Sequence, residues 1–170
     1  MDAMLTRLLD EQAIYKQLHN YCRSMDRCDV ALGKAVFHPD AEVDYGTMFQ
    51  GSGHGFVDAT IHAHLHGGLR NHMHRISNIS IEVDGDRAGS EAYADARFRM
   101  ENDGKLIELY TRGRYIDRWE KRGGRWAISR RDYVHEMDGQ FEPSNERFAY
   151  AAKRDPSDIS YAALGTAVNA

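Results

Sequence analysis

The chain has 170 residues, the usual length of one domain, and its 42% hydrophobic and 28% charged residues exclude a disordered chain. Its formal net charge of −4 argues against a nucleic-acid partner. No targeting segment is visible, and no apolar run approaches the roughly 20 residues of a membrane span, so we expect a cytoplasmic protein without a membrane partner.

The first half of the chain predicts three helices and a short stretch of strand. Apolar residues recur every three to four positions over residues 2–24, which is the period of an amphipathic helix. A second, shorter helix is expected over 29–37, with Asp29 as its N-cap. Residues 41–50 are expected to form a strand or hairpin, and a glycine-rich break separates them from a third helix over 55–66.

From residue 70 onward the apolar residues alternate with polar ones, which is typical of strands. Three turn sequences rich in Asp, Asn, Arg and Gly divide this region. They delimit four long strands, the first with one phase slip, at 70–83, 87–101, 105–120 and 125–137. Helices followed by a meander of strands predict an α+β fold. Its cone-shaped, curved antiparallel sheet has N-terminal helices on the concave side and encloses a pocket.

We expect one domain over residues 1–138 and a C-terminal tail over 139–170. The tail is weakly patterned, and a short helix is expected near residues 145–153. Such a segment is either frayed or packed on a neighbouring subunit.

Several segments carry a family resemblance over roughly residues 5–138. They are Tyr21-x4-Asp26, the segment HPDAEVDY at 38–45, His74 on the first long strand, and RWAISRRDYV at 125–134. In this order they resemble the SnoaL-like branch of the nuclear-transport-factor-2-like superfamily. The resemblance implies the NTF2-like α+β barrel, with dimers or trimers packed through the sheet. It also implies eliminating lyases that use neither a metal nor an organic cofactor.

Three groups of that branch are the most similar: scytalone dehydratases, bile-acid 7α-dehydratases and lindane dehydrochlorinases. They share an Asp after the first helix and a His on the first long strand, and Asp26 and His74 match this arrangement. Tyr21 matches a tyrosine of the bile-acid group, whereas the lindane group has a lysine there. Basic residues on the last strand assist in these families, and the candidates here are Arg131 and His135, the latter standing where the bile-acid group has an arginine.

The matching residues suit proton abstraction beside a leaving group. An imidazole can accept a proton near neutral pH when a carboxylate orients its other nitrogen, so His74 is the candidate base and Asp26 its partner. Tyr21 and Asp26 both face the pocket mouth if the first helix ends between them, and the Tyr21 hydroxyl then donates to substrate. Arg131 and His135 are the two candidates for stabilising developing negative charge. Each residue also has a structural alternative: a strand hydrogen bond for His74, a turn cap for Asp26, and core packing for Tyr21.

Five of the nine histidines lie between residues 62 and 74, and a cluster of this density raises the question of a metal site. On a helix only His62 and His66 share a face, and on a strand His72 and His74 do. No HExxH motif and no cysteine at ligand spacing accompany them, so we expect no metal. We expect His72 or His66 to line the pocket as a polar contact instead.

The remaining binding contacts are expected from apolar and aromatic residues around the pocket. The predicted substrate-binding residues are Tyr45, Phe49, His72, Tyr110 and His135. Cys22 and Cys28 are expected to be reduced thiols without a catalytic role.

Together these features predict a lyase that needs no cofactor and acts on a small, hydrophobic, aromatic hydroxylated molecule. The leaving group is water or a small aldehyde. Two alternatives stay open: an isomerase or polyketide-cyclase type of proton shuttle, and a ligand-binding module without catalysis. A homodimer or homotrimer is expected, because a curved sheet leaves one broad face to be covered.

Overall fold

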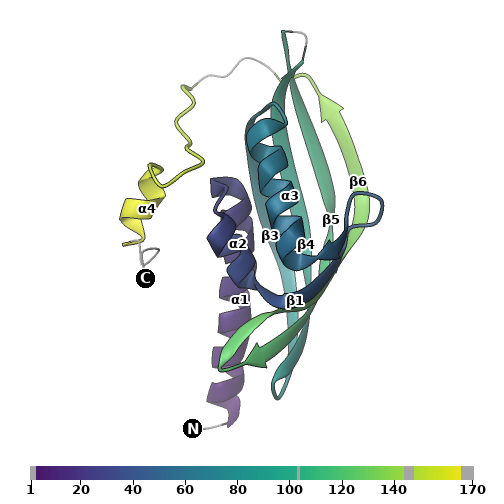
Figure 1. Cartoon of the computed structure of the whole chain (residues 1–170), viewed down its shortest axis with the longest axis vertical. Helices are drawn as coiled ribbons and strands as arrows, with labels where there is room; N and C mark the ends of the chain where they lie inside the picture. Colours follow the sequence, from purple (N-terminus) through teal and green to yellow (C-terminus); the bar gives the residue numbers. More distant parts are fainter. Residues whose placement is uncertain (1–2, 103, 144–147, 166–170) are drawn as a thin grey trace.

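The computed structural model describes residues 3–102, 104–143 and 148–165. Helices α1 and α2 come first along the chain, strands β1 and β2 precede helix α3, four long strands follow, and a short helix lies near the C-terminus (Figure 1). The helices are α1 (Ala3–Arg27), α2 (Val30–Val36), α3 (Gly53–His66) and α4 (Ile159–Ala163). The strands are β1 (Phe37–Asp44), β2 (Gln50–Ser52), β3 (Leu69–Asp84), β4 (Arg87–Asn102), β5 (Lys105–Arg122) and β6 (Arg125–Phe141).

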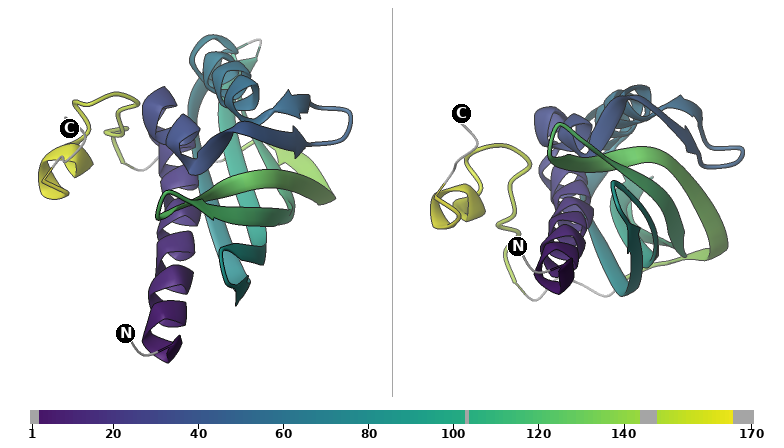
Figure 2. Two further views of the ribbon diagram at one scale, coloured as in Figure 1. Left: turned by 60° about the horizontal axis from the view of Figure 1, so that its bottom comes forward. Right: turned by 90° about the horizontal axis from the view of Figure 1, so that it is seen from below.

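The sheet has the order β2-β1-β6-β5-β4-β3 and curls around the N-terminal helices without closing (Figure 2). The α+β fold with helices on the concave side is therefore confirmed. One pairing differs from the expected antiparallel sheet, because β1 runs parallel to β6. Strand β1 follows α2 directly and pairs with the edge of β6 that β5 leaves free. The other four pairings are antiparallel.

Helix α1 packs its apolar stripe into the concave side of the sheet. The buried stripe repeats at helical spacing: Ile14, Leu18, Tyr21, Cys22 and Met25. The helix continues to Arg27, beyond its predicted end at residue 24, and therefore includes Asp26. Asp29 caps α2 as predicted, because its carboxylate accepts a hydrogen bond from the Leu32 N–H at 2.9 Å.

The long strands separate an apolar concave face from a charged outer face. The predicted phase slip in β3 is a register shift between Ser77 and Ser80, where Asn78 adopts a φ of 47°. Alanines on the concave side of β4, at positions 92, 94 and 96, are buried, and Ala94 belongs to the hydrophobic core. The outer face carries ion-pair networks such as Arg75–Asp95–Arg112.

The C-terminal segment packs on the chain's own helices. No helix is present over 148–153, so the expectation of one near 145–153 is wrong there; residues 144–147 lie outside the described part. Helix α4 instead lies beside α1 and α2 (Figure 1). Arg27 binds the Asp158 carboxylate at 2.9 Å, and Arg154 donates to the carbonyl oxygens of His64 and Leu69 at 2.7 and 3.1 Å. Among the described residues, no helix is both long and apolar enough to cross a membrane.

Candidate active site

Asp26 and His74 meet where the last turn of α1 crosses β3. The His74 ring Nδ1 lies 2.8 Å from Asp26 Oδ1, and the His74 backbone N–H donates to the same carboxylate at 2.9 and 3.2 Å. The side chain of His74 is 8% exposed and that of Asp26 is 12% exposed. A carboxylate at a helix C-terminus faces the negative end of the helix dipole, so it needs donors of this kind. Both donors come from His74, which fixes the position of the pair.

The hydrogen bond to Asp26 selects one tautomer of His74. An ionised carboxylate can only accept, so Nδ1 carries the proton and donates it. Nε2 then carries the lone pair and can accept a proton from another molecule. If the ring becomes charged, the Asp26 carboxylate stabilises it. The pair therefore has the arrangement of a general base with its orienting carboxylate.

Two further histidines surround His74 on the concave side. The His64 ring centroid lies 4.1 Å from that of His72 and 5.7 Å from that of His74, and Phe98 lies 5.7 to 6.3 Å from all three. His72 Nε2–H donates to the Met25 carbonyl in the last turn of α1 at 2.8 Å, and the same carbonyl accepts from the Cys28 N–H at 3.3 Å. No group of three or more His, Cys, Asp or Glu residues in the described ranges is arranged to hold a metal ion.

His64 was not identified from the sequence as a site residue. His62 and His66 do share a helix face, with ring centroids 4.5 Å apart, but both are exposed and neither lies in the cluster. His64 is buried because it continues the inward stripe of α3 that includes Val57 and Ile61. The three-to-four-residue spacing of that stripe is the signal that would have placed it inward.

Burial of His64 predicts a pH-dependent stability. Burial, followed by the neighbouring His72 and His74, lowers the pKa of His64 from 6.5 to about 3. The unfolded chain therefore takes up a proton below pH 6.5 that the folded chain does not accept. We expect the free energy of unfolding to fall by about 1.4 kcal/mol per pH unit from this group as the pH drops from 6.5 towards 3.

The measurement is urea unfolding at a series of pH values in that window, comparing the wild type with His64→Gln and with the exposed control His62→Gln. His64→Gln should flatten the dependence on pH, although burial lowers the pKa of His72 as well and leaves part of the slope. An unchanged slope in His64→Gln would contradict the assignment.

Tyr21 lies in the core rather than beside the pair. The helix does not end between Tyr21 and Asp26, so five residues at about 100° each place their side chains roughly 140° apart around α1. The Tyr21 hydroxyl lies 3.0 Å from that of Tyr45, and both rings are buried. The condition under which Tyr21 would reach substrate together with Asp26 is therefore not met.

Arg131 is also enclosed in this core. Its guanidinium forms a two-pronged ion pair with Asp117, both distances being 2.7 Å, and both side chains are fully buried. The charged group lies 4.2 and 4.1 Å from the ring centroids of Tyr21 and Tyr115. Two of its nitrogens bind the carboxylate and aromatic rings cover it, so the structure does not bring it to the surface of the concave side.

An aromatic stack lies next to this core. Tyr45 stacks on Phe56 and on Tyr133, with ring centroids 4.1 and 5.3 Å apart, and Phe49 packs edge-on against Phe56 at 5.4 Å. The Tyr133 hydroxyl lies 3.0 Å from Thr111 Oγ1. Burial raises the pKa of Tyr133 above its usual 10. The hydrogen bond with Thr111 lowers this pKa in part, and the nearby Asp138 and Glu136 raise it further, so the hydroxyl stays protonated at neutral pH.

Strand register places the Thr111 side chain in one row with His74. His74 lies opposite Ala96 on β4, and Ala96 lies opposite Thr111 on β5. Directly opposite residues share a face of the sheet, so all three belong to the concave side. Tyr133 was missed from the sequence, although it alternates along β6 between Arg131 and His135, two residues assigned to this face.

The two remaining predicted contacts lie farther out. His135 is half exposed at the rim, 6.3 Å from Tyr133 between ring centroids and 3.2 Å from Asp138 through Nε2. Tyr110 lies on the outer face, where Arg112 is 5.1 Å from its ring centroid. The period of two explains this: Thr111 faces the concave side, so Tyr110 faces away from it.

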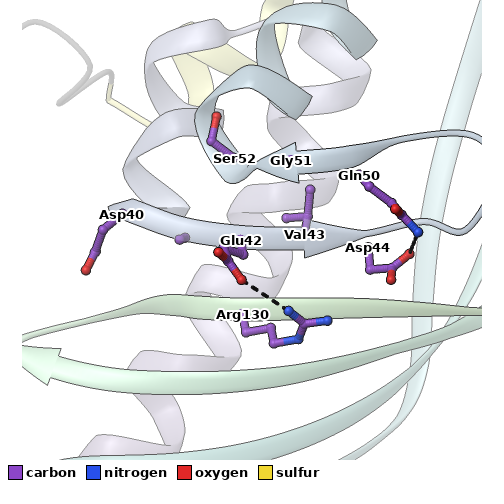
Figure 3. A pocket seen from close by; sticks show the side chains of 9 residues that line it. Asp40, Glu42, Val43, Asp44, Gln50, Gly51, Ser52 and Arg130 are labelled. Carbon is purple, nitrogen blue, oxygen red and sulfur yellow. Dashed lines mark hydrogen bonds and ion pairs between the residues drawn. The ribbon is translucent and has the colours of Figure 1, made fainter.

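A surface groove of about 580 Å³ lies along β1 and β2, and a second one of about 490 Å³ is lined by residues of β1, β4, β5 and β6; His74 lines neither. Figure 3 shows the larger one, in which Arg130 reaches towards Glu42. Arg130 also binds Asp132 at 2.6 Å, so its charge is already matched. The larger groove is lined by Asp40, Ala41, Glu42, Val43, Asp44, Gln50, Gly51, Ser52 and Arg130. Open, charged grooves of this kind differ from the apolar, enclosed sites that small molecules usually occupy.

Comparisons with known proteins agree with the fold. A model of the SnoaL-like domain matches residues 6–132. A scytalone dehydratase-like protein from Novosphingobium aromaticivorans is 25% identical, with a TM-score of 0.68 over 88% of this chain and 95% of that one. The hexachlorocyclohexane dehydrochlorinase LinA-type3 from Novosphingobium barchaimii is 15% identical, with a TM-score of 0.72 over 88% and 100%. An NTF2-like superfamily protein from Salmonella enterica is 19% identical, with a TM-score of 0.62 over 82% and 96%. A search among curated proteins gives no match.

Proposed function

The chain belongs to the SnoaL-like domain family, and within it we propose that this protein is a cofactor-independent lyase. The observation that carries the proposal is the 2.8 Å hydrogen bond between Asp26 and His74 Nδ1, which leaves Nε2 as a base. The similarity to a scytalone dehydratase-like protein at 25% identity supports an elimination reaction. The proposed substrate is a small, hydrophobic, hydroxylated aromatic compound, because Phe98 and the rings of His64 and His72 lie beside His74.

In the proposed reaction, His74 Nε2 removes a proton from a carbon atom next to the carbon that bears the leaving group. The electron pair of the broken C–H bond forms the new double bond as the C–O bond breaks. The leaving hydroxyl takes a proton from a donor on the concave side or from water and departs as water, and His74 then returns its own proton to solvent. Asp26 stabilises the imidazolium while it exists. The same base also suits removal of a hydroxyl proton. The electrons of that O–H bond then form the carbonyl of a small aldehyde as the neighbouring C–C bond breaks, and the carbon that keeps the C–C electron pair takes a proton.

The roles first expected for Tyr21 and Arg131 are changed in this proposal. Both are buried, and their polar groups bind Tyr45 and Asp117. We assign them to the packing that supports α1, and the leaving group must be assisted from elsewhere on the concave side. His72, Tyr45 and Phe49 are retained as residues that shape the binding site.

A panel of hydroxylated aromatic compounds, incubated with the protein in deuterated water, tests the proposal. Mass spectrometry separates loss of water or an aldehyde from simple uptake of deuterium. Elimination that is absent in His74→Ala supports the lyase. Deuterium uptake without elimination would indicate the proton-shuttle isomerase. This isomerase is the second candidate because neither Tyr21 nor Arg131 lies beside His74 to assist a leaving group. If neither reaction occurs with any compound, the lyase proposal fails.

We also propose that the protein forms a homodimer or homotrimer through the outer face of the sheet. Tyr93 and Val134 lie in one row on that face, on either side of Arg114, and both are partly exposed together with Met137. Exposed apolar groups of this kind favour association. Analytical ultracentrifugation of the wild type and of Tyr93→Lys tests this, and a wild-type monomer would refute it.

A further inference from the structure

We propose that Tyr133 is a catalytic hydrogen-bond donor that faces His74 across Ala96, and that Thr111 is its positioning residue. The inference rests on the proposed lyase and deepens it, because it assigns the group that assists the leaving hydroxyl. It also predicts that the substrate carries an oxygen on the side opposite the proton that His74 removes.

Strand register gives the spacing between the two groups. His74, Ala96 and Thr111 occupy three adjacent strands in one row of the concave face. Neighbouring strands lie about 4.8 Å apart, so the backbones of His74 and Thr111 are roughly 10 Å apart. The side chain between them is a methyl group. An aromatic ring placed over Ala96 would have His74 on one side and a hydroxyl on the other.

The Tyr133 ring lies over Gly113, where a side chain would clash with it. A Cβ atom built at Gly113 would lie 2.6 Å from both Cζ and the hydroxyl oxygen of Tyr133, so the ring occupies the space that any other residue would fill. Tyr45 stacks on the Tyr133 ring, with the ring centroids 5.3 Å apart. These contacts direct the hydroxyl along the sheet to Thr111 Oγ1, 3.0 Å away, in the row that leads to His74.

Two paired hydroxyls always retain a free donor. A single hydrogen bond between them uses one of the two protons, and the other proton remains available to a third group. When Thr111 donates to Tyr133, the phenolic proton is the free one. A phenol is the stronger acid of the two, so Tyr133 is the group suited to donate to an oxygen that gains negative charge as it leaves.

Tyr133→Phe and Thr111→Val test the assignment, because each removes a hydroxyl at nearly constant shape. In deuterated water, His74 still exchanges the substrate proton in Tyr133→Phe, whereas elimination falls by about 10²-fold. Thr111→Val lowers elimination in the same way but less, and Thr111→Ser restores it. Tyr110→Phe, on the outer face, is the matched control and keeps the wild-type rates. Equal loss of exchange and elimination, or no loss, in Tyr133→Phe overturns the proposal.

A binding measurement keeps this test separate from the lyase proposal. Calorimetry with phenol and toluene requires no turnover. The wild type should bind phenol more tightly than toluene, and Tyr133→Phe should lose most of that preference, while Tyr110→Phe keeps it. Thermal unfolding confirms that each variant is folded. If the wild type does not distinguish phenol from toluene, the hydroxyl pair is not a substrate contact, whatever reaction the protein catalyses.

Discussion

Replacing His74 by Ala is expected to lower kcat for elimination by about 10²- to 10⁴-fold, with a much smaller change in KM. The reason is that general-base catalysis contributes this much to a proton transfer, and the lone pair on Nε2 is the group that accepts the proton. Asp26→Asn should cause a loss of similar size although it retains the shape. An amide offers a donor as well as an acceptor, so the carboxylate no longer selects the Nδ1–H tautomer or stabilises the imidazolium.

Two controls separate catalysis from folding. Asp29 lies three residues beyond Asp26 and caps α2 through the Leu32 N–H. Asparagine is an equally good cap, so Asp29→Asn should leave both stability and rate near the wild type. The exposed His62→Ala serves the same purpose for the histidine. The pair would have no catalytic role if Asp26→Asn and His74→Ala kept more than a tenth of the wild-type kcat.

Local sequence patterns predict most of the helices and strands of this fold. Three patterns identified the elements: the helical period of α1, the Asp29 cap, and the period of two after residue 70. The two periods arise because the apolar side chains of a helix or strand must lie on the one face that is buried. The parallel pairing of β1 with β6 was beyond these patterns. It depends on where α2 delivers the chain relative to a strand almost 90 residues later, and no local signal encodes that distance.

The candidate site divides in the same way. The resemblance supplied Asp26 and His74, which lie 48 residues apart. The predicted end of α1 was too early, and Tyr21 was therefore expected on the same side as Asp26. In the structure the helix continues to Arg27, and Tyr21 points in a different direction from Asp26. Tyr110 could have been excluded from the sequence. The buried alanines of β4 set the inward phase, and the tight turn to β5 carries that phase to Thr111 rather than Tyr110. His64 and Tyr133 were missed, although the inward stripe of α3 indicates His64 and the alternation along β6 indicates Tyr133.

The buried ion pair between Arg131 and Asp117 carries the largest expected effect on stability. Both side chains are fully buried, and two hydrogen bonds of 2.7 Å join them. Burial alone would lower the pKa of Arg131, but the adjacent carboxylate of Asp117 raises it well above its usual value, so the guanidinium stays charged. Asp117→Asn retains the shape but leaves that charge unpaired in the core. We therefore expect the free energy of unfolding to fall by about 3–5 kcal/mol.

Urea unfolding at neutral pH measures this loss, with two comparisons that isolate its cause. Glu142→Gln removes one partner of the exposed pair Lys105–Glu142, whose side chains are both 67% exposed, and should cost no more than about 1 kcal/mol. The double variant Asp117→Leu/Arg131→Met removes both charges and fills the space with apolar groups, so it should be more stable than Asp117→Asn alone. This ordering follows only if the cost arises from an uncompensated charge. If the double variant were the less stable of the two, the pair would stabilise the core through its own hydrogen bonds and its contacts with Tyr21 and Tyr115.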